Sequence, residues 1–243
     1  MSASSNALLA IDSSTERLCL ALQFGGGEHW VDQTGGAQAS AQLLPQLLGL
    51  LAQAGTRLAD LDAIAFACGP GAFTGLRTAC AVAQGLAFGA ARPVLALDSL
   101  LIVAEDARVA AGAPPVFDLW VVMDARMDEV YAGRYAWSDG RWTVHDAPAL
   151  YDLPTLHARW HGAPPAALAG SALQAFGERL QVGAAAQYPV QQQRAAALLR
   201  VAQQAWQRGD TLDAADALPL YLRDKVALTT AERAAAKAGE AAG

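Results

Sequence analysis

The sequence predicts an α/β fold of two lobes, each with the element order βββαβα. Three observations predict this fold. Short apolar runs of strand length alternate with longer segments of helical periodicity, as in mixed α/β proteins. A group of three strands stands before a first helix twice. A Gly-Ala-Pro-Pro break at residues 112–115 separates the two groups and marks a boundary between lobes.

The first lobe, residues 1–111, begins with three strands that we expect to pair as an antiparallel meander. Their apolar runs are residues 7–12, 17–24 and 29–33. Helical periodicity then extends over residues 40–51 and stops at Gly55. The elements expected to complete the lobe are a strand at 63–67, a helix at 76–88, a strand at 93–97 and a helix at 100–110.

The second lobe, residues 112–223, repeats this order. The expected elements are strands at 119–124, 129–137 and 142–146, a helix at 153–160, a strand at 166–169, and helices at 173–180 and 191–208. Asp12 closes the first strand of one lobe and Asp124 that of the other. Residues 224–243 become rich in Ala, Glu and Lys from Thr229 onward, and we expect a flexible tail there.

A duplicated three-stranded meander followed by alternating helices and strands is the arrangement of the actin-like ATPase (ASKHA) fold. This fold is a duplicated ribonuclease H-like unit. In it, the turn between the first two strands of a lobe faces phosphate, so the corresponding turns of this chain are the first candidate sites.

Composition narrows the classes of function. Of 243 residues, 53% are apolar and 16% are charged, so the chain can bury a real core. Its net charge is −6 and it has no run of five like charges, which argues against a nucleic-acid-binding surface as its main feature. If the protein serves a nucleic acid, we expect another chain to make most of the phosphate contacts.

Cysteine usage and hydropathy indicate a cytoplasmic protein. Cys19, Cys68 and Cys80 show no CxxC spacing and leave one cysteine over after any pairing, which favours a reduced compartment. The first ten residues carry no Lys or Arg, so we expect no secretory signal. No apolar run reaches the ~18 residues of a membrane helix, so we expect no membrane association.

The turn at Asp12, Ser13 and Ser14 has two interpretations. Small hydroxyl groups and free backbone N–H groups could hold an anion there, and Asp12 could orient a hydrated cation. Alternatively, the Asp and Ser side chains bond only the backbone of a turn. No glycine follows Asp12 closely, so the backbone is less free to approach phosphate than in a kinase of this fold.

The glycine-rich GPGAFTG run at 69–75 joins a strand to a helix. Glycines allow close backbone approach, and a helix N-terminus attracts anions, so we expect Gly69, Pro70, Gly71 and Thr74 to face phosphate. Thr74 is also the expected N-cap of the helix. The run is not a Walker A loop, because no Gly-Lys-Ser/Thr follows. The alternative is a tight connection that binds no ligand.

Four charged residues surround the corresponding turn of the second lobe, at 124–129. Asp124 and Arg126 could address a ligand across the cleft from Asp12. Alternatively, Arg126 and Glu129 form a structural ion pair that holds the turn. The sequence leaves both interpretations open.

His157 and His161 have the i, i+4 spacing of a helical metal pair. No Glu lies beside them, and Gly162 ends the helix at once. We therefore expect an exposed helix end here and no metal site in this chain.

Two helices of the first lobe are expected to form a partner surface. The helix at 40–51 carries more leucine than one buried stripe needs, and its candidate contact residues are Leu43, Leu44, Leu47, Leu48 and Leu51. In the next helix, Ala81, Gly85 and Gly89 recur every four residues and would let another helix approach closely. The alternative is that both helices only pack on their own sheet.

Four motifs carry a resemblance to a known family. They are AIDSS at 10–14, GPGAFTGLR at 69–77, DARMDEVY at 124–131 and YLR at 221–223. With these motifs in order, the chain resembles the TsaB (YeaZ) family from residue 7 to about residue 223. The second and third motifs are specific to that family, whereas the first alone would be weak. Ala72 departs from the family, which commonly has Ser there.

The resemblance implies a non-catalytic chain that dimerises with TsaD, works beside the ATPase TsaE, and forms a homodimer when alone. The complex transfers a threonylcarbamoyl group from its adenylate to the adenosine next to the anticodon of ANN-decoding tRNAs. The resemblance further implies that tRNA is contacted mainly through the complex. This chain would need no cofactor, and ATP and metal would bind the partner subunits.

Two other functions stay open. An independent actin-like ATPase or phosphotransferase would need glycine turns in both lobes, and neither Asp12 nor Asp124 is followed by such a glycine. A glycoprotease-like metallohydrolase would need metal ligands. TsaD-type relatives carry an HxxxH metal motif on the helix after the strand at 93–97, and residues 98–103 contain no histidine.

Overall fold

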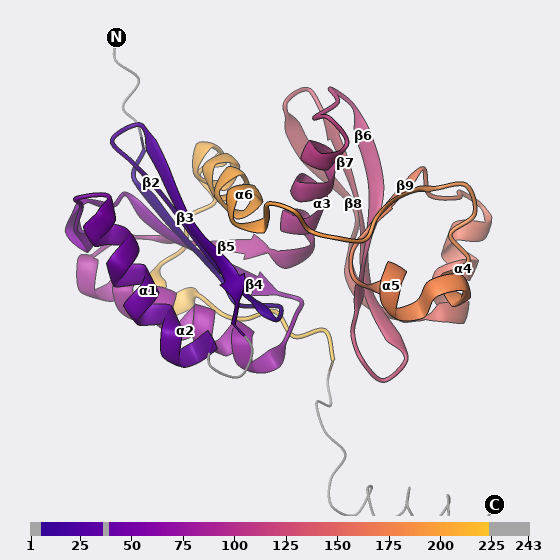
Figure 1. The fold of residues 1–243 in the computed structure, drawn as a ribbon, viewed down its shortest axis with the longest axis horizontal. Coiled ribbons are helices and arrows are strands. Elements are labelled where there is room, and N and C mark those ends of the chain that lie inside the picture. The colour runs from indigo at the N-terminus through magenta and orange to yellow at the C-terminus, as the bar shows by residue number, and fades with distance from the viewer. Residues whose placement is uncertain (1–5, 36–38, 224–243) are drawn as a thin grey trace, which may run out of the picture.

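A computed structural model of the chain describes residues 6–35 and 39–223 (Figure 1). The expected flexible tail at 224–243 lies outside the described residues. Two five-stranded sheets form the frame, with strand orders β3-β2-β1-β4-β5 and β10-β9-β6-β7-β8. Among the described helices, none combines the length and the apolar character that crossing a bilayer requires.

The elements follow the chain in two groups. The first group is β1 (Leu8–Asp12), β2 (Arg17–Phe24), β3 (Gly27–Thr34), α1 (Ala39–Gln53), β4 (Ala63–Gly69), α2 (Phe73–Ala90), β5 (Val94–Asp98) and α3 (Ser99–Ala110). The second is β6 (Phe117–Asp124), β7 (Glu129–Ser138), β8 (Arg141–Asp152), α4 (Leu153–His161), β9 (Ala167–Ala169), α5 (Ala172–Phe176), β10 (Ala186–Tyr188) and α6 (Arg194–Arg208).

The pairing of the strands confirms the duplicated actin-like fold. In each sheet the first three strands form an antiparallel meander, and the first strand also pairs in parallel with the strand that follows the next helix. Some boundaries differ from the prediction. The helix expected at 173–180 divides into α5 and a 3-10 turn, because Gly177 adopts a positive φ of 54°. Strand β10 was not predicted.

The two faces of the first sheet are covered by different helices. Alternate residues of each strand point to opposite faces, so Leu9 and Ile11 of β1 face α1 and α2. Leu8 and Ala10 face α3 and α6, together with side chains from the second sheet. Helix α6 thus packs on the first sheet although it follows the second sheet in the chain (Figure 1). The division into lobes at residue 111 stays a proposal.

After α6 the chain returns along the first lobe as residues 210–223, which contain one 3-10 turn at Ala214–Asp216 and which we call the C-terminal strap. Leu212 pairs with Val94 at the end of the sheet. The Leu220 N–H donates to the carbonyl of Cys68 at 2.7 Å. The amide of Gln84 on α2 donates to two carbonyls of the strap. The strap ends near the turn between β6 and β7, so it connects the two lobes.

Candidate functional site at the cleft between the lobes

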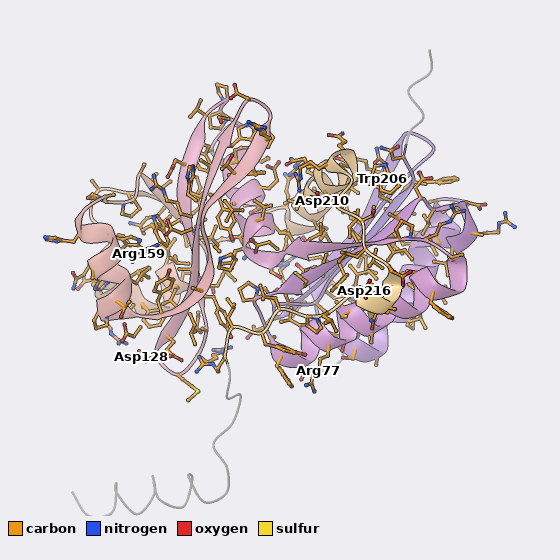
Figure 2. The ribbon with its side chains drawn as sticks, turned by 180° about the vertical axis from the view of Figure 1, so that it is seen from behind. Arg77, Asp128, Arg159, Trp206, Asp210 and Asp216 are labelled. Carbon is orange, nitrogen blue, oxygen red and sulfur yellow. The ribbon has the colours of Figure 1, made fainter. Side chains whose placement is uncertain are left out.

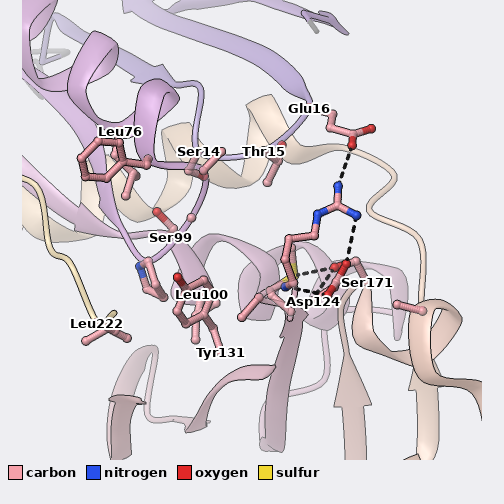
Figure 3. Close-up of a pocket in the computed structure, with 18 of the residues that line it drawn as sticks. Ser14, Thr15, Glu16, Leu76, Ser99, Leu100, Asp124, Tyr131, Ser171 and Leu222 are labelled. Carbon is pink, nitrogen blue, oxygen red and sulfur yellow. Dashed lines mark hydrogen bonds and ion pairs between the residues drawn. The ribbon is translucent and has the colours of Figure 1, made fainter. Parts of the chain in front are cut away.

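A cleft of about 800 Å³ lies between the lobes. Its walls come from the β1–β2 turn, the N-terminal ends of α2 and α3, the β6–β7 turn, the start of α6 and the strap (Figure 3). All four motifs of the family resemblance contribute residues to these walls. Segments far apart in the sequence therefore meet at one place.

Asp12 does not line this cleft, and each of its carboxylate oxygens accepts a hydrogen bond from inside the protein. Its Oδ2 accepts a hydrogen bond from Nε of Arg194 at 2.6 Å, and both side chains are 1% exposed. Its Oδ1 accepts the N–H of Ser14 at 2.7 Å. Arg194 also donates to the Ser14 hydroxyl and to Gln191. Of the two interpretations of this turn, the geometry favours the second: the Asp12 carboxylate bonds the backbone of the turn and Arg194, and it does not orient a cation in the cleft.

The glycine-rich run packs against the β1–β2 turn. A Cβ atom at Gly75 would lie 1.7 Å from the Ser13 carbonyl oxygen, and one at Gly71 would lie 2.4 Å from that of Ser14. The Ser13 hydroxyl donates to the Gly75 carbonyl at 2.9 Å. These two glycines thus allow the glycine-rich run and the β1–β2 turn to touch. Ser13 is buried where the two segments meet and does not line the cleft.

Two other residues of the run also lie outside the cleft wall. Gly69 is covered by the strap, because a Cβ there would lie 2.5 Å from the carbonyl oxygen of Leu220. Thr74 is not the N-cap: helix α2 begins at Phe73, and Ala72 precedes it without a side-chain cap. Pro70, Gly71 and Ser14 do line the cleft as expected.

On the opposite wall, Asp124 and Arg126 lie in the cleft as predicted, but Arg126 has internal partners. Its guanidinium lies 3.2 Å from Glu16 of the first lobe and 3.3 Å from Asp124 (Figure 3). Glu129 pairs instead with Arg223 of the strap at 2.5 Å. The alternative pair of Arg126 with Glu129 is therefore wrong.

The backbone of this turn is unusual. Arg126, Met127 and Asp128 all adopt positive φ angles, of 62°, 54° and 62°. Such angles are uncommon for residues with a Cβ and often occur at functional sites. The Asp124 carboxylate stabilises the turn by accepting the N–H of Arg126 at 2.8 Å.

A partly buried hydrogen bond joins the lobes next to the cleft wall. The Tyr135 hydroxyl on β7 donates to Asp98 at the end of β5, at 2.6 Å. Asp98 also caps α3 by accepting the N–H of Leu100. Burial raises the pKa of Asp98 to about 6, although the hydrogen bond from Tyr135 acts in the opposite direction.

The charged side chains around the cleft are largely paired with one another. Each arginine that lines it is already paired with a carboxylate; these are Arg17, Arg126, Arg194 and Arg223. In the described part of the chain, no three His, Cys, Asp or Glu side chains are grouped so that they could hold a metal. Nε2 of His157 lies 2.9 Å from the Leu180 carbonyl oxygen.

The partner surface predicted on α1 and α2 needs one correction. Leu43, Leu47 and Leu51 are buried against the sheet, so they belong to the core. Leu44 and Leu48 are 44% and 51% exposed. The outer face of α1 and α2 therefore carries only part of the predicted set.

On α2 the predicted row of small residues, Ala81, Gly85 and Gly89, is exposed, and a Cβ at either glycine would meet no neighbouring atom. Phe88, which the sequence analysis did not select, is 83% exposed on the same helix. We call the exposed set Leu44, Leu48, Ala81, Gly85, Phe88 and Gly89 the outer helix face.

Comparisons with known proteins agree on one family. The family model described as "TsaD: tRNA N6-adenosine threonylcarbamoyltransferase" matches residues 33–156. The tRNA threonylcarbamoyladenosine biosynthesis protein TsaB of Escherichia coli is 30% identical over 236 residues, which cover 90% of this chain and 96% of that protein. The protein of the same name from Haemophilus influenzae is 40% identical over 124 residues, 51% of each chain.

Two solved structures have the same fold. YeaZ from Pseudomonas aeruginosa superposes with a TM-score of 0.78 at 37% identity, covering 89% of this chain and all of that one. A Pseudomonas aeruginosa protein described as similar to peptidase YEAZ gives a TM-score of 0.81, also at 37% identity, with 90% and 100% coverage.

Proposed function

The chain belongs to the TsaB (YeaZ) family, and we propose that it is a non-catalytic subunit that pairs with TsaD in the complex that makes threonylcarbamoyladenosine in tRNA. Its relatives in Escherichia coli and Haemophilus influenzae are named for the biosynthesis of this modified nucleoside, which supports a role in the same biosynthesis. The pairing and the lack of catalysis are the parts that we propose.

The outer helix face is the observation that carries the pairing. It combines exposed leucines on α1 with a row on α2 that carries at most a methyl group at each position. Large exposed apolar residues such as Phe88 mark interaction surfaces when they gather in one patch. We propose a TsaD subunit as the partner: the TsaD family model matches this chain over residues 33–156, which include α1 and α2, so a TsaD subunit would present related helices to this face. Two related lobes could then pack these helices as a four-helix bundle.

The buried Asp12–Arg194 pair supports the non-catalytic part. An ATPase of this fold would use the carboxylate at the end of its first strand near phosphate, and here that carboxylate is neutralised inside the protein. We propose that this chain needs no cofactor of its own, and that TsaD and TsaE bring the ATP and metal. We further propose that it contacts tRNA through the complex and forms a homodimer through the same face when TsaD is absent.

The pairing is tested with one charge on the small-residue row and one matched control. Gly85→Arg places a long cation where a partner helix would approach, and a buried unpaired charge costs several kcal/mol. Gly162→Arg is the control, because Gly162 is also exposed and also has free space for a Cβ, but it lies in the second lobe. Both variants are run with TsaD of the same organism on a size-exclusion column, alongside circular dichroism and melting curves.

We expect the wild type and Gly162→Arg to co-elute with TsaD, and Gly85→Arg to remain folded and elute alone. A folded Gly85→Arg variant that still co-elutes would refute the interface. A wild-type chain that never co-elutes would refute the partnership. ATP hydrolysis by the purified chain, lost in a folded Asp12→Ala variant, would refute the non-catalytic role.

A further inference from the structure

Arg77 on α2 is exposed, yet its guanidinium is held in one place (Figure 2). The guanidinium carbon lies 3.9 Å from the centroid of the Phe73 ring, a distance at which cation and ring attract each other. Nε donates to the Tyr221 hydroxyl at 2.8 Å. The rings of Phe73 and Tyr221 are themselves 5.0 Å apart. The strap thus fixes a surface cation that would otherwise lose side-chain entropy on binding.

Arg77 has no acidic partner among the described residues, and this is uncommon in the chain. Of its fourteen described arginines, eleven form ion pairs, and the three that do not are Arg77, Arg92 and Arg141. Arg92 instead donates to the Ala59 carbonyl. With a net charge of −6, carboxylates outnumber cations in this protein. An ordered arginine left without one is therefore available to a carboxylate from another chain.

The position of Arg77 relates it to the outer helix face. It lies four residues before Ala81, and residues four apart are neighbours on a helix surface. The row therefore runs Arg77, Ala81, Gly85 and Gly89. A partner helix that packs along the three small residues passes beside the guanidinium at the N-terminal end of α2.

We propose that Arg77 is the docking cation of the outer helix face and that it binds a carboxylate of the TsaD subunit. Its two terminal nitrogens make no hydrogen bond to a described residue, so they can donate together to one carboxylate, the geometry that arginine favours. Phe73 and Tyr221 position the guanidinium for this contact. The inference rests on the proposed pairing with TsaD.

The test measures the dissociation constant for TsaD by a titration at low and at high ionic strength. Arg77→Gln should weaken binding at least about tenfold, or about 1.4 kcal/mol, and should reduce the dependence of affinity on salt, because salt screens the lost attraction. Arg77→Lys keeps the charge but not the paired donors, so its affinity for TsaD should lie between those of the wild type and Arg77→Gln. Arg141→Gln is the matched control: it removes another exposed arginine that forms no ion pair with a described residue, and should bind like the wild type.

Tyr221→Phe removes the hydrogen bond to Arg77 but keeps both the ring and the charge. We expect a smaller loss of affinity with an unchanged salt dependence. If Arg77 only ties the strap to α2, Arg77→Gln will lower the melting temperature and leave the affinity for TsaD unchanged, and the proposal falls. If Gly85→Arg abolishes binding while Arg77→Gln binds like the wild type, the pairing stands and only this inference fails.

Discussion

Arg194 and Asp12 lie 182 residues apart in the chain and form an ion pair, with 2.6 Å between Nε and Oδ2 and each side chain only 1% exposed. The pair fixes the start of α6 to the end of β1. It also fills the place where an actin-like ATPase would bring a carboxylate to phosphate. The same contact therefore joins β1 to α6 and keeps the Asp12 carboxylate inside the protein.

Asp12→Ala should strongly destabilise the protein, because it leaves the Arg194 guanidinium buried without a counter-charge. Removing one partner of a buried ion pair costs about 3–5 kcal/mol. Urea unfolding followed by circular dichroism measures the loss. The double variant Asp12→Leu with Arg194→Met removes both charges and should recover much of the stability. A single variant that unfolds at the same urea concentration as the wild type would contradict the structural role of the pair.

Zinc should bind the purified chain only at substoichiometric levels. His157 lies within hydrogen-bond distance of the Leu180 carbonyl, and the described residues include no group of ligands that could complete a site around it. Elemental analysis after zinc loading and desalting measures the content. If the wild type binds stoichiometric zinc, and both His157→Ala and His161→Ala lose it, these histidines form a metal site.

Arg223→Ala should release the end of the C-terminal strap. Arg223 pairs with Glu129 and also donates to the Ala125 carbonyl at 3.0 Å, so it joins the strap to the second lobe. The Leu220 amide, which is bonded to the Cys68 carbonyl, should then exchange its hydrogen about tenfold faster, a change of about 1.4 kcal/mol in local opening. Arg57→Ala removes the exposed ion pair with Asp60, which lies outside the strap, and should not change this rate. Unaltered exchange in Arg223→Ala would show that the strap is held without it.

The fold could be predicted from the sequence because its signals are local. Apolar runs of strand length, helical periodicity and a Gly-Pro break each occupy a few neighbouring residues, and their order occurs twice. The ends of the helices were harder to predict than their presence. No side chain caps α2 at Ala72, so the sequence offered only Thr74 as a cap. Leu44 and Leu47 look alike in the sequence, and only the packing of α1 separates the exposed leucine from the buried one.

The site could be predicted only in part, because its contacts join distant segments. Pro70, Gly71, Ser14, Asp124 and Arg126 do line the cleft. The ion pair of Asp12 could not be predicted, because nothing near Asp12 in the chain indicates that an arginine on α6 would bind it. Gly71 was expected to face phosphate; it lines the cleft, and together with Gly75 it lets two turns touch. The strap lacks periodicity, and its YLR motif was the one signal of its importance.

The last prediction concerns the buried carboxyl of Asp98. Burial raises its pKa from 3.8 to about 6, so the folded protein keeps a proton that the unfolded chain has already released. The folded state thus binds more protons between about pH 4 and pH 6, and the free energy of unfolding must fall as pH rises through this window. A shift of about two pKa units corresponds to about 3 kcal/mol. The side chain of Asp98→Asn cannot ionise, so the free energy of unfolding of this variant should fall less between about pH 4 and pH 6 than that of the wild type. Urea unfolding at several pH values measures the difference.

Tyr135→Phe is a second test of the pKa of Asp98, because it keeps the carboxyl group and removes only the hydroxyl that donates to it. That hydrogen bond lowers the pKa of Asp98, so its loss should raise the pKa further and move the fall in stability to higher pH. Carbon NMR of the carboxyl group reports the same shift directly. If the wild type and Asp98→Asn show the same pH dependence, Asp98 is ionised in the folded protein at its ordinary pKa, and the hydrogen bond between the lobes does not titrate in this range.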